Sequence, residues 1–140
     1  MKIKSGKFII YIAWVQALVA TLGSLYFSEI RHFTPCLLCW YQRILMYPLV
    51  IIIAVGILRK DKFLYQYVLP LSIIGVFVAF YQVLLQESIL PERVAPCSLG
   101  VSCLTKYVMF FGFITIPVMS LAAFLVITIC MYIFKKNNKK

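Results

Sequence analysis

Two cysteines three positions apart, Cys36 and Cys39, have the spacing in this sequence that most directly indicates chemistry. They lie in the stretch FTPCLLCWYQR, residues 33–43, between two very apolar segments. Such a CxxC pair can be a structural disulfide, half of a zinc site or a redox pair. A second pair, Cys97 and Cys103, follows later in the chain with five residues between its members.

The residues around the first pair predict a helix that begins just before it. Thr34 is a favourable N-cap residue, and Pro35 suits the first helical position, where its missing N–H costs nothing. Cys36 and Cys39 would then share one face of the first turn. The positive end of the helix dipole and the unpaired backbone N–H groups there favour a thiolate. The local sequence therefore favours a reactive pair.

The composition predicts that these cysteines belong to an integral membrane protein. Hydrophobic residues make up 64% of the 140 residues, with a mean hydropathy of +0.98, whereas soluble domains are about 45–50% apolar. Four apolar runs approach the ~20 residues that cross a bilayer as a helix. They are residues 8–27, 40–58, 63–86 and 108–134. The first run is too long for the apolar region of a cleaved signal peptide. We therefore expect one all-α membrane domain, residues 1–140, built as a four-helix bundle.

The charges predict how this bundle is oriented. The net charge is +10, and ten of the fourteen basic residues flank the helices on one side of a four-pass topology. These ten are Lys2, Lys4, Lys7, Arg59, Lys60, Lys62, Lys135, Lys136, Lys139 and Lys140. The positive-inside rule places both termini and the 59–62 turn in the cytoplasm. This distribution argues against nucleic-acid binding, and the basic tail suits contact with anionic membrane lipid.

The same topology puts both cysteine pairs outside the cytoplasm, in two loops. Close-spaced pairs in an oxidising space imply disulfide chemistry. A zinc site would normally combine two CxxC-like spacings on polar turns, which the second pair lacks. Structural disulfides that close such short loops would stabilise the fold little, whereas short accessible ones tend to exchange. Redox work is favoured, and a non-catalytic tetraspan assembly or binding subunit with structural disulfides is the alternative. Cys130 is interpreted as a small buried apolar residue.

Arg43 follows Cys39 by one helical turn on the same face. An arginine at the membrane boundary is costly without a partner, so it marks a site unless it reaches lipid phosphates. It could stabilise a thiolate and donate hydrogen bonds to a carbonyl ligand. Oxidation of a dithiol releases two electrons, and the sequence has no haem, dinucleotide or flavin motif. A quinone, which is lipid-soluble and has carbonyls, is the economical acceptor.

These residues resemble the disulfide bond formation protein B (DsbB) family. The resemblance lies in PCLLCWYQR (35–43), the four predicted helices and the second cysteine pair between the last two of them. The stretches PCSLGVSC (96–103) and GFITIPVMSLAAF (112–124) resemble the compact Gram-positive branch, often called BdbC. The likeness covers essentially the whole chain. It implies an enzyme of the bacterial cell membrane that reoxidises a thioredoxin-like extracytoplasmic thiol oxidase and passes the electrons to membrane quinone, either menaquinone or ubiquinone.

The resemblance also implies a role for each catalytic cysteine. Cys39 would lie next to the quinone, and its thiolate would form a charge-transfer complex or adduct there. Cys36 would be the exposed member that exchanges with the second pair. Cys97 would form the mixed disulfide with the partner, and Cys103 would relay to Cys36. Arg43 matches the quinone-site arginine of the family.

The second pair departs from the best-known members of the family. There the second pair is much more widely spaced and its loop carries a helix that lies on the lipid, whereas six positions separate Cys97 from Cys103 here. The order of exchange in this loop is therefore open. A vitamin K epoxide reductase-like enzyme also couples CxxC chemistry to quinones, but its CxxC is expected late in the bundle.

Gln82 and Gln86 are further candidates for the quinone site. They lie four residues apart near the outer end of the third apolar segment, at the level expected for Arg43. They could line a quinone pocket or form a hydrogen bond between helices. We expect no metal ion at the site.

Overall fold

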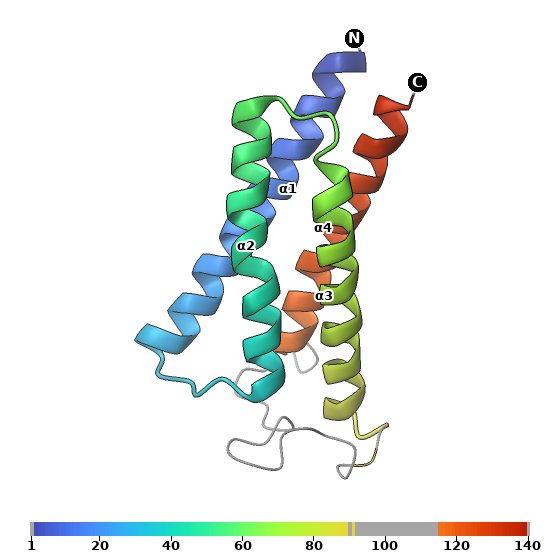
Figure 1. The fold of residues 1–140 in the computed structure, drawn as a ribbon. Helices are drawn as coiled ribbons and strands as arrows, with labels where there is room; N and C mark the ends of the chain where they lie inside the picture. The colour runs from blue at the N-terminus through green and yellow to red at the C-terminus, as the bar shows by residue number, and fades with distance from the viewer. Residues whose placement is uncertain (1, 90, 92–114, 140) are drawn as a thin grey trace.

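The computed structural model is a bundle of four long helices (Figure 1). It describes residues 2–89, 91 and 115–139. The helices are α1 (Lys2–Leu25), α2 (Leu37–Arg59), α3 (Tyr65–Gln86) and α4 (Ile116–Asn138). A short π-helical segment, η1 (Tyr26–Ile30), continues α1. Each of the four long helices is long and apolar enough to cross a membrane. The predicted all-α, four-helix membrane fold is confirmed.

The helices bury small and apolar residues against one another and expose large apolar residues outward. Leu49, Ile53, Phe124 and Ile127 are fully buried between the helices. Gly75 of α3 faces the ring of Phe124, and a Cβ at this position would overlap that ring. Large apolar side chains such as Phe8, Leu58 and Phe77 are exposed on the outside. Close approach at small residues, with apolar side chains turned outward, is typical of helices that pack within lipid.

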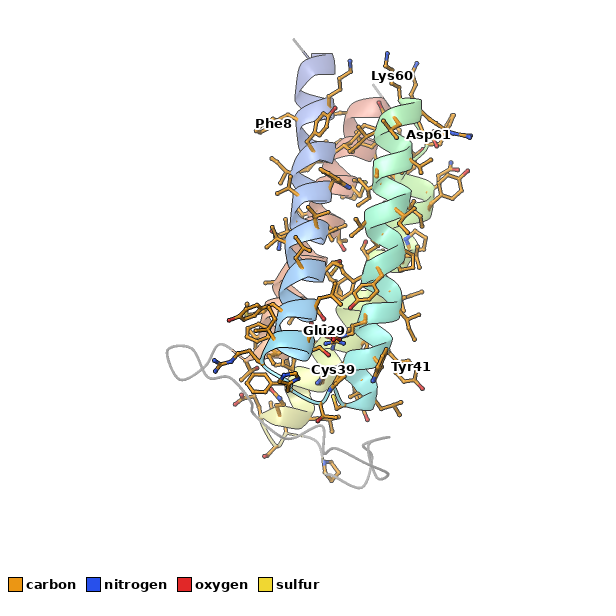
Figure 2. All side chains as sticks on the ribbon, turned by 90° about the vertical axis from the view of Figure 1, so that its left-hand side faces the viewer. Phe8, Glu29, Cys39, Tyr41, Lys60 and Asp61 are labelled. Atoms are coloured by element: carbon orange, nitrogen blue, oxygen red, sulfur yellow. The ribbon has the colours of Figure 1, made fainter. Side chains whose placement is uncertain are left out.

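The two ends of the bundle differ in what they contain. Both termini and the turn between α2 and α3 lie at one end (Figure 1). Figure 2 shows Cys39 and Tyr41 at the opposite end from Lys60 and Asp61. The turn is tight because Lys60 adopts a left-handed conformation, with φ 53° and ψ 40°. Its N–H and that of Asp61 bond back to carbonyls of the last turn of α2.

The second helix begins later than the sequence predicts. Cys36, not Thr34, is its N-cap residue, and the first helical residue is Leu37. Cys36 is extended, with φ −72° and ψ 171°, while its carbonyl already accepts a hydrogen bond from Trp40 N at 3.1 Å. Because Cys36 itself is extended, Thr34 and Pro35 before it stay outside the helix. The start of the predicted run 108–134 lies outside the described residues.

Candidate active site

The first cysteine pair lies where α2 begins, with its two sulfurs close together. The Sγ atoms of Cys36 and Cys39 are 2.9 Å apart and share a hydrogen bond. Cys36 is only 6% exposed, whereas Cys39 is half-buried. Cys36 is buried because it packs with Leu38 and with Leu85 of α3. This order of exposure is the reverse of the one that the resemblance implies, in which Cys36 is the exposed member.

The two cysteines have different electrostatic environments. The hydrogen bond with Cys39, followed by burial, raises the pKa of the Cys36 thiol. Cys36 therefore keeps its proton and donates it to the sulfur of Cys39. Cys39 lies in the first turn of α2, where backbone N–H groups have no partner within the helix. The sulfur of Cys39 is therefore the better placed of the two to hold negative charge.

Gln82 of α3 contacts both sulfurs. Its Nε2 donates to Cys36 Sγ at 3.3 Å and to Cys39 Sγ at 3.2 Å. Gln82 is 1% exposed, and its Oε1 accepts a hydrogen bond from Gln42 Nε2 at 2.6 Å. Ser120 Oγ of α4 in turn donates to Gln42 Oε1 at 2.5 Å. Three helices thus contribute to one chain of hydrogen bonds that ends at the cysteine pair.

A cavity of about 260 Å³ lies beside the cysteine pair. Its walls include Gly23 and Ser24 of α1, Cys39 and Arg43 of α2, and Pro117 and Ser120 of α4. Most of the wall is apolar, with a few polar groups, as is usual for sites that bind small organic molecules. The volume is close to the lower end of the range for such sites, ~300 Å³. Toward this end of the bundle, α1 leans away from α4 (Figure 1).

Arg43 is held at the wall of this cavity by the backbone of α1. Its Nη2 donates to the Ser24 carbonyl at 3.1 Å, and its guanidinium lies 5.7 Å from the centre of the Trp40 ring. Guanidinium groups favour such positions over aromatic rings. A guanidinium has five N–H groups, so the bond to Ser24 leaves donors for a ligand in the cavity.

The structure separates the two glutamines that the sequence places together. Gln86 lines the cavity, and its Oε1 is buried without a hydrogen-bond partner among the described residues. Gln82 does not line the cavity and contacts the sulfurs instead. Sequence reasoning missed Gln42 and Ser120. The only signal in the sequence was that each is a polar residue inside a very apolar segment. This signal was not enough, because the sequence does not show which faces of the helices meet.

Comparison with known proteins identifies the family. Residues 6–134 match the family model described as "Disulfide bond formation protein DsbB". The chain belongs to the DsbB family. The chain is 49% identical to "Disulfide bond formation protein C" of Bacillus subtilis (strain 168), over 94% of this chain and 95% of that protein.

Two further relatives match most of this chain. A "Probable disulfide formation protein C" of Halalkalibacterium halodurans is 48% identical over 84% of this chain and 86% of its own length. A "Probable disulfide formation protein C 1" of Bacillus anthracis is 40% identical over 96% of this chain and 97% of its own. No solved structure matches the chain significantly. As a DsbB-family member, the chain is a multi-pass membrane disulfide oxidoreductase that supports disulfide-bond formation.

Two of the predicted catalytic cysteines, Cys97 and Cys103, lie outside the described residues. Cys130 lies on α4, well along the helix from the residues that line the cavity, and is half-buried. The described ranges contain no group of three or more side chains that could hold a metal ion.

Proposed function

We propose that this chain takes electrons from a thioredoxin-like extracytoplasmic thiol oxidase and passes them to a membrane quinone. The observation that supports this most is the position of Cys39. Its sulfur is half-buried at the wall of an apolar cavity that Arg43 also lines, inside a membrane-spanning bundle. A dithiol in such a place needs an acceptor that is soluble in lipid and has groups for an arginine to bind.

The residues around the cavity fit a quinone ring. The apolar wall suits the ring, and the free N–H groups of Arg43 suit a ring carbonyl. A bound quinone would accept two electrons and two protons and leave as the quinol. Oxidation of two thiols to a disulfide releases two electrons and two protons. Where Cys39 is already a thiolate, the second proton for the quinol comes from the solvent. The raised pKa of the Cys36 thiol favours its protonated form in the reduced pair.

The second cysteine pair is proposed to connect this site to the partner. Cys97 would form the mixed disulfide with the partner, and Cys103 would pass the electrons on to Cys36. In this proposal both pairs lie on the extracytoplasmic face of the bacterial cell membrane. Because Cys36 is 6% exposed, the incoming thiolate has to reach a covered sulfur, so exchange at Cys36 requires the surrounding side chains to move aside.

Quinone reduction by purified protein tests the proposal. The full chain is placed in vesicles that contain menaquinone or ubiquinone, a reduced thioredoxin-like oxidase is added, and quinone absorbance is followed. We expect one quinone to be reduced per dithiol oxidised, and no reduction by Cys39→Ser. Cys130→Ser is the matched control and should keep the parent rate. Full activity of Cys39→Ser would show that the proposed electron path is wrong.

Two further results separate the proposal from a non-catalytic subunit. Arg43→Lys keeps the charge but loses the planar pair of donors, so the KM for quinone should rise about tenfold. The control is Arg59→Lys, at the other end of α2, which should leave this KM unchanged. On a non-reducing gel, Cys103→Ala should trap a mixed disulfide between Cys97 and the partner, whereas Cys97→Ala should trap none. Outer cysteines that stay oxidised and trap no partner would instead indicate an assembly subunit.

A further inference from the structure

Three polar side chains from different helices form one continuous hydrogen-bonded chain to the cysteine pair. Ser120 of α4 donates to Gln42 of α2, Gln42 donates to Gln82 of α3, and Gln82 donates to both sulfurs. Gln42 and Gln82 are 6% and 1% exposed. Hydrogen bonds are stronger in such low-dielectric surroundings, and a buried polar group without a partner is costly. Breaking this series of hydrogen bonds would therefore be energetically costly.

The hydroxyl of Ser120 gives this chain a direction. A serine has one O–H to donate, and Ser120 directs it to Gln42 Oε1 at 2.5 Å and not to the Pro117 carbonyl at 3.1 Å, because the shorter contact is the stronger bond. Because Gln42 Oε1 accepts from Ser120, the Nε2 of Gln42 faces Gln82 and donates to Gln82 Oε1. The amide of Gln82 is then left with its Nε2 toward the cysteines.

The direction matters because an amide has two opposite faces. Nε2 of Gln82 presents two N–H groups, which suit a sulfur that carries negative charge. If the amide were reversed, its carbonyl lone pairs would face the same sulfurs and repel that charge. Gln82 supplies the donors, but Gln42 and Ser120 decide which face of Gln82 the cysteines meet.

We infer that Gln42 and Ser120 are positioning residues that hold the Gln82 amide with its N–H groups toward Cys36 and Cys39. The hydrogen bonds favour the reduced pair with charge on Cys39, and so make it a faster nucleophile and a stronger oxidant when it is a disulfide. This inference concerns the thiol chemistry of the pair, so it stands or falls separately from the proposed quinone reduction.

The test uses thiol readouts without quinone, since Gln42 and Ser120 also border the cavity. The full chain with Cys97, Cys103 and Cys130 replaced by alanine is purified in detergent. One readout is the rate at which iodoacetamide alkylates Cys39 at neutral pH, located by mass spectrometry. The other is the equilibrium of the pair with glutathione, in which the dithiol and oxidised glutathione give the disulfide and two reduced glutathiones.

Loss of any member of the chain should move both readouts in the same direction. Gln82→Leu should slow alkylation about tenfold, the size expected when a charged group loses a hydrogen bond. Gln42→Leu and Ser120→Ala should give smaller losses, and all three should shift the glutathione equilibrium toward the disulfide. Ser120→Thr keeps the hydroxyl and should restore parent values. Ser120→Ala should add nothing to Gln82→Leu, because Ser120 acts through Gln82.

Ser72→Ala is the matched control. Ser72 is fully buried in α3 and donates to the carbonyl of Leu69, but it has no part in the hydrogen-bonded chain to the cysteines. Its loss should lower thermal stability at most and leave both thiol readouts unchanged. The inference is overturned if Ser120→Ala and Gln42→Leu keep parent alkylation rates and glutathione equilibria, or if Ser72→Ala shifts them equally.

Discussion

The cysteines of the CxxC pair differ because each meets a different set of neighbours. Cys36 precedes the helix, is covered by side chains of α2 and α3, and has its pKa raised by the hydrogen bond with Cys39. Cys39 accepts a hydrogen bond from Gln82 and lies at the cavity wall. The two cysteines of the motif are therefore not equivalent. Cys36 favours its protonated form, and Cys39 is better placed to act as the nucleophile.

This difference predicts the order of alkylation. Because the pKa of Cys36 is raised, its thiolate fraction at neutral pH is smaller than that of an ordinary thiol. Brief treatment with iodoacetamide between about pH 7 and 9, around the ordinary thiol pKa, should therefore label Cys39 before Cys36. Peptide mass spectrometry measures the ratio. Equal labelling of both cysteines at pH 8 would contradict this assignment.

At the residue scale the sequence predicted the groups that a motif brings together, but not those that folding brings together. Cys36, Cys39 and Arg43 are within one stretch, so spacing alone indicated a shared site. The bond from Gln82 to the sulfurs spans more than forty positions, and that from Ser120 to Gln42 spans 78. Such contacts depend on which faces of the helices meet, and hydropathy does not determine this.

At the scale of the helices, two glycines differ in how much space surrounds them. Gly75 allows α3 to approach α4 at Phe124, whereas a Cβ at Gly23 of α1 would have no atom within 4 Å outside its own helix. Gly75 belongs to the packed half of the bundle, and Gly23 borders the cavity. Substitution at these positions therefore tests packing and cavity separately.

Gly75→Ala should destabilise the protein. The added methyl group overlaps the ring of Phe124, which is fully buried between the helices and must shift to make room. Overpacking of this kind costs about 1–3 kcal/mol. Thermal unfolding in detergent, followed by tryptophan fluorescence, measures the effect, with Gly23→Ala as the control. A Tm of Gly75→Ala equal to that of the parent would show that the helices separate more easily than the structure implies.

Gly23→Leu should instead fill the cavity without disturbing the fold. The larger side chain enters space that the proposed quinone ring occupies, so quinone reduction should fall at least tenfold, the size of one lost contact of about 1.4 kcal/mol. Thermal stability and the glutathione equilibrium of the cysteine pair should stay at parent values. Unchanged quinone reduction by Gly23→Leu would place the quinone elsewhere.

The helices themselves were predictable, and their ends were not. Apolar length was enough to find four spans. The start of α2 was wrong by two residues, because the capping rules favoured Thr34 and Pro35 while the extended backbone of Cys36 sets the boundary. The π-helical segment that follows Leu25 had no sequence signal. Boundaries depend on the backbone conformation of single residues, which composition does not report.

The whole molecule has two chemically different ends. One end has both termini and the turn at Lys60, and the other has the cysteine pair (Figures 1 and 2). The basic residues are concentrated at the first end, which the positive-inside rule assigns to the cytoplasm. In the proposed orientation the protein would present its thiol chemistry to the outside, and its basic end would face anionic lipid of the inner leaflet.

Impermeant thiol labelling of intact cells tests this orientation. In a background without native cysteines, Lys62→Cys and Ile89→Cys place single thiols at exposed positions at opposite ends of the bundle. A membrane-impermeant maleimide should label Ile89→Cys in intact cells and Lys62→Cys only after lysis. The reverse pattern would invert the proposed topology and place the Cys36–Cys39 pair in the cytoplasm.

The anchor of Arg43 has a consequence for how this site can change over generations. Arg43 bonds the main-chain carbonyl of Ser24 and not its side chain, and every amino acid provides that carbonyl. Substitution at position 24 therefore leaves the anchor in place. An inserted residue earlier in α1 does not, because it rotates everything after it by about 100° and advances it by about 1.5 Å. The anchor of the arginine thus depends on the phase of the neighbouring helix and not on which side chain stands at position 24.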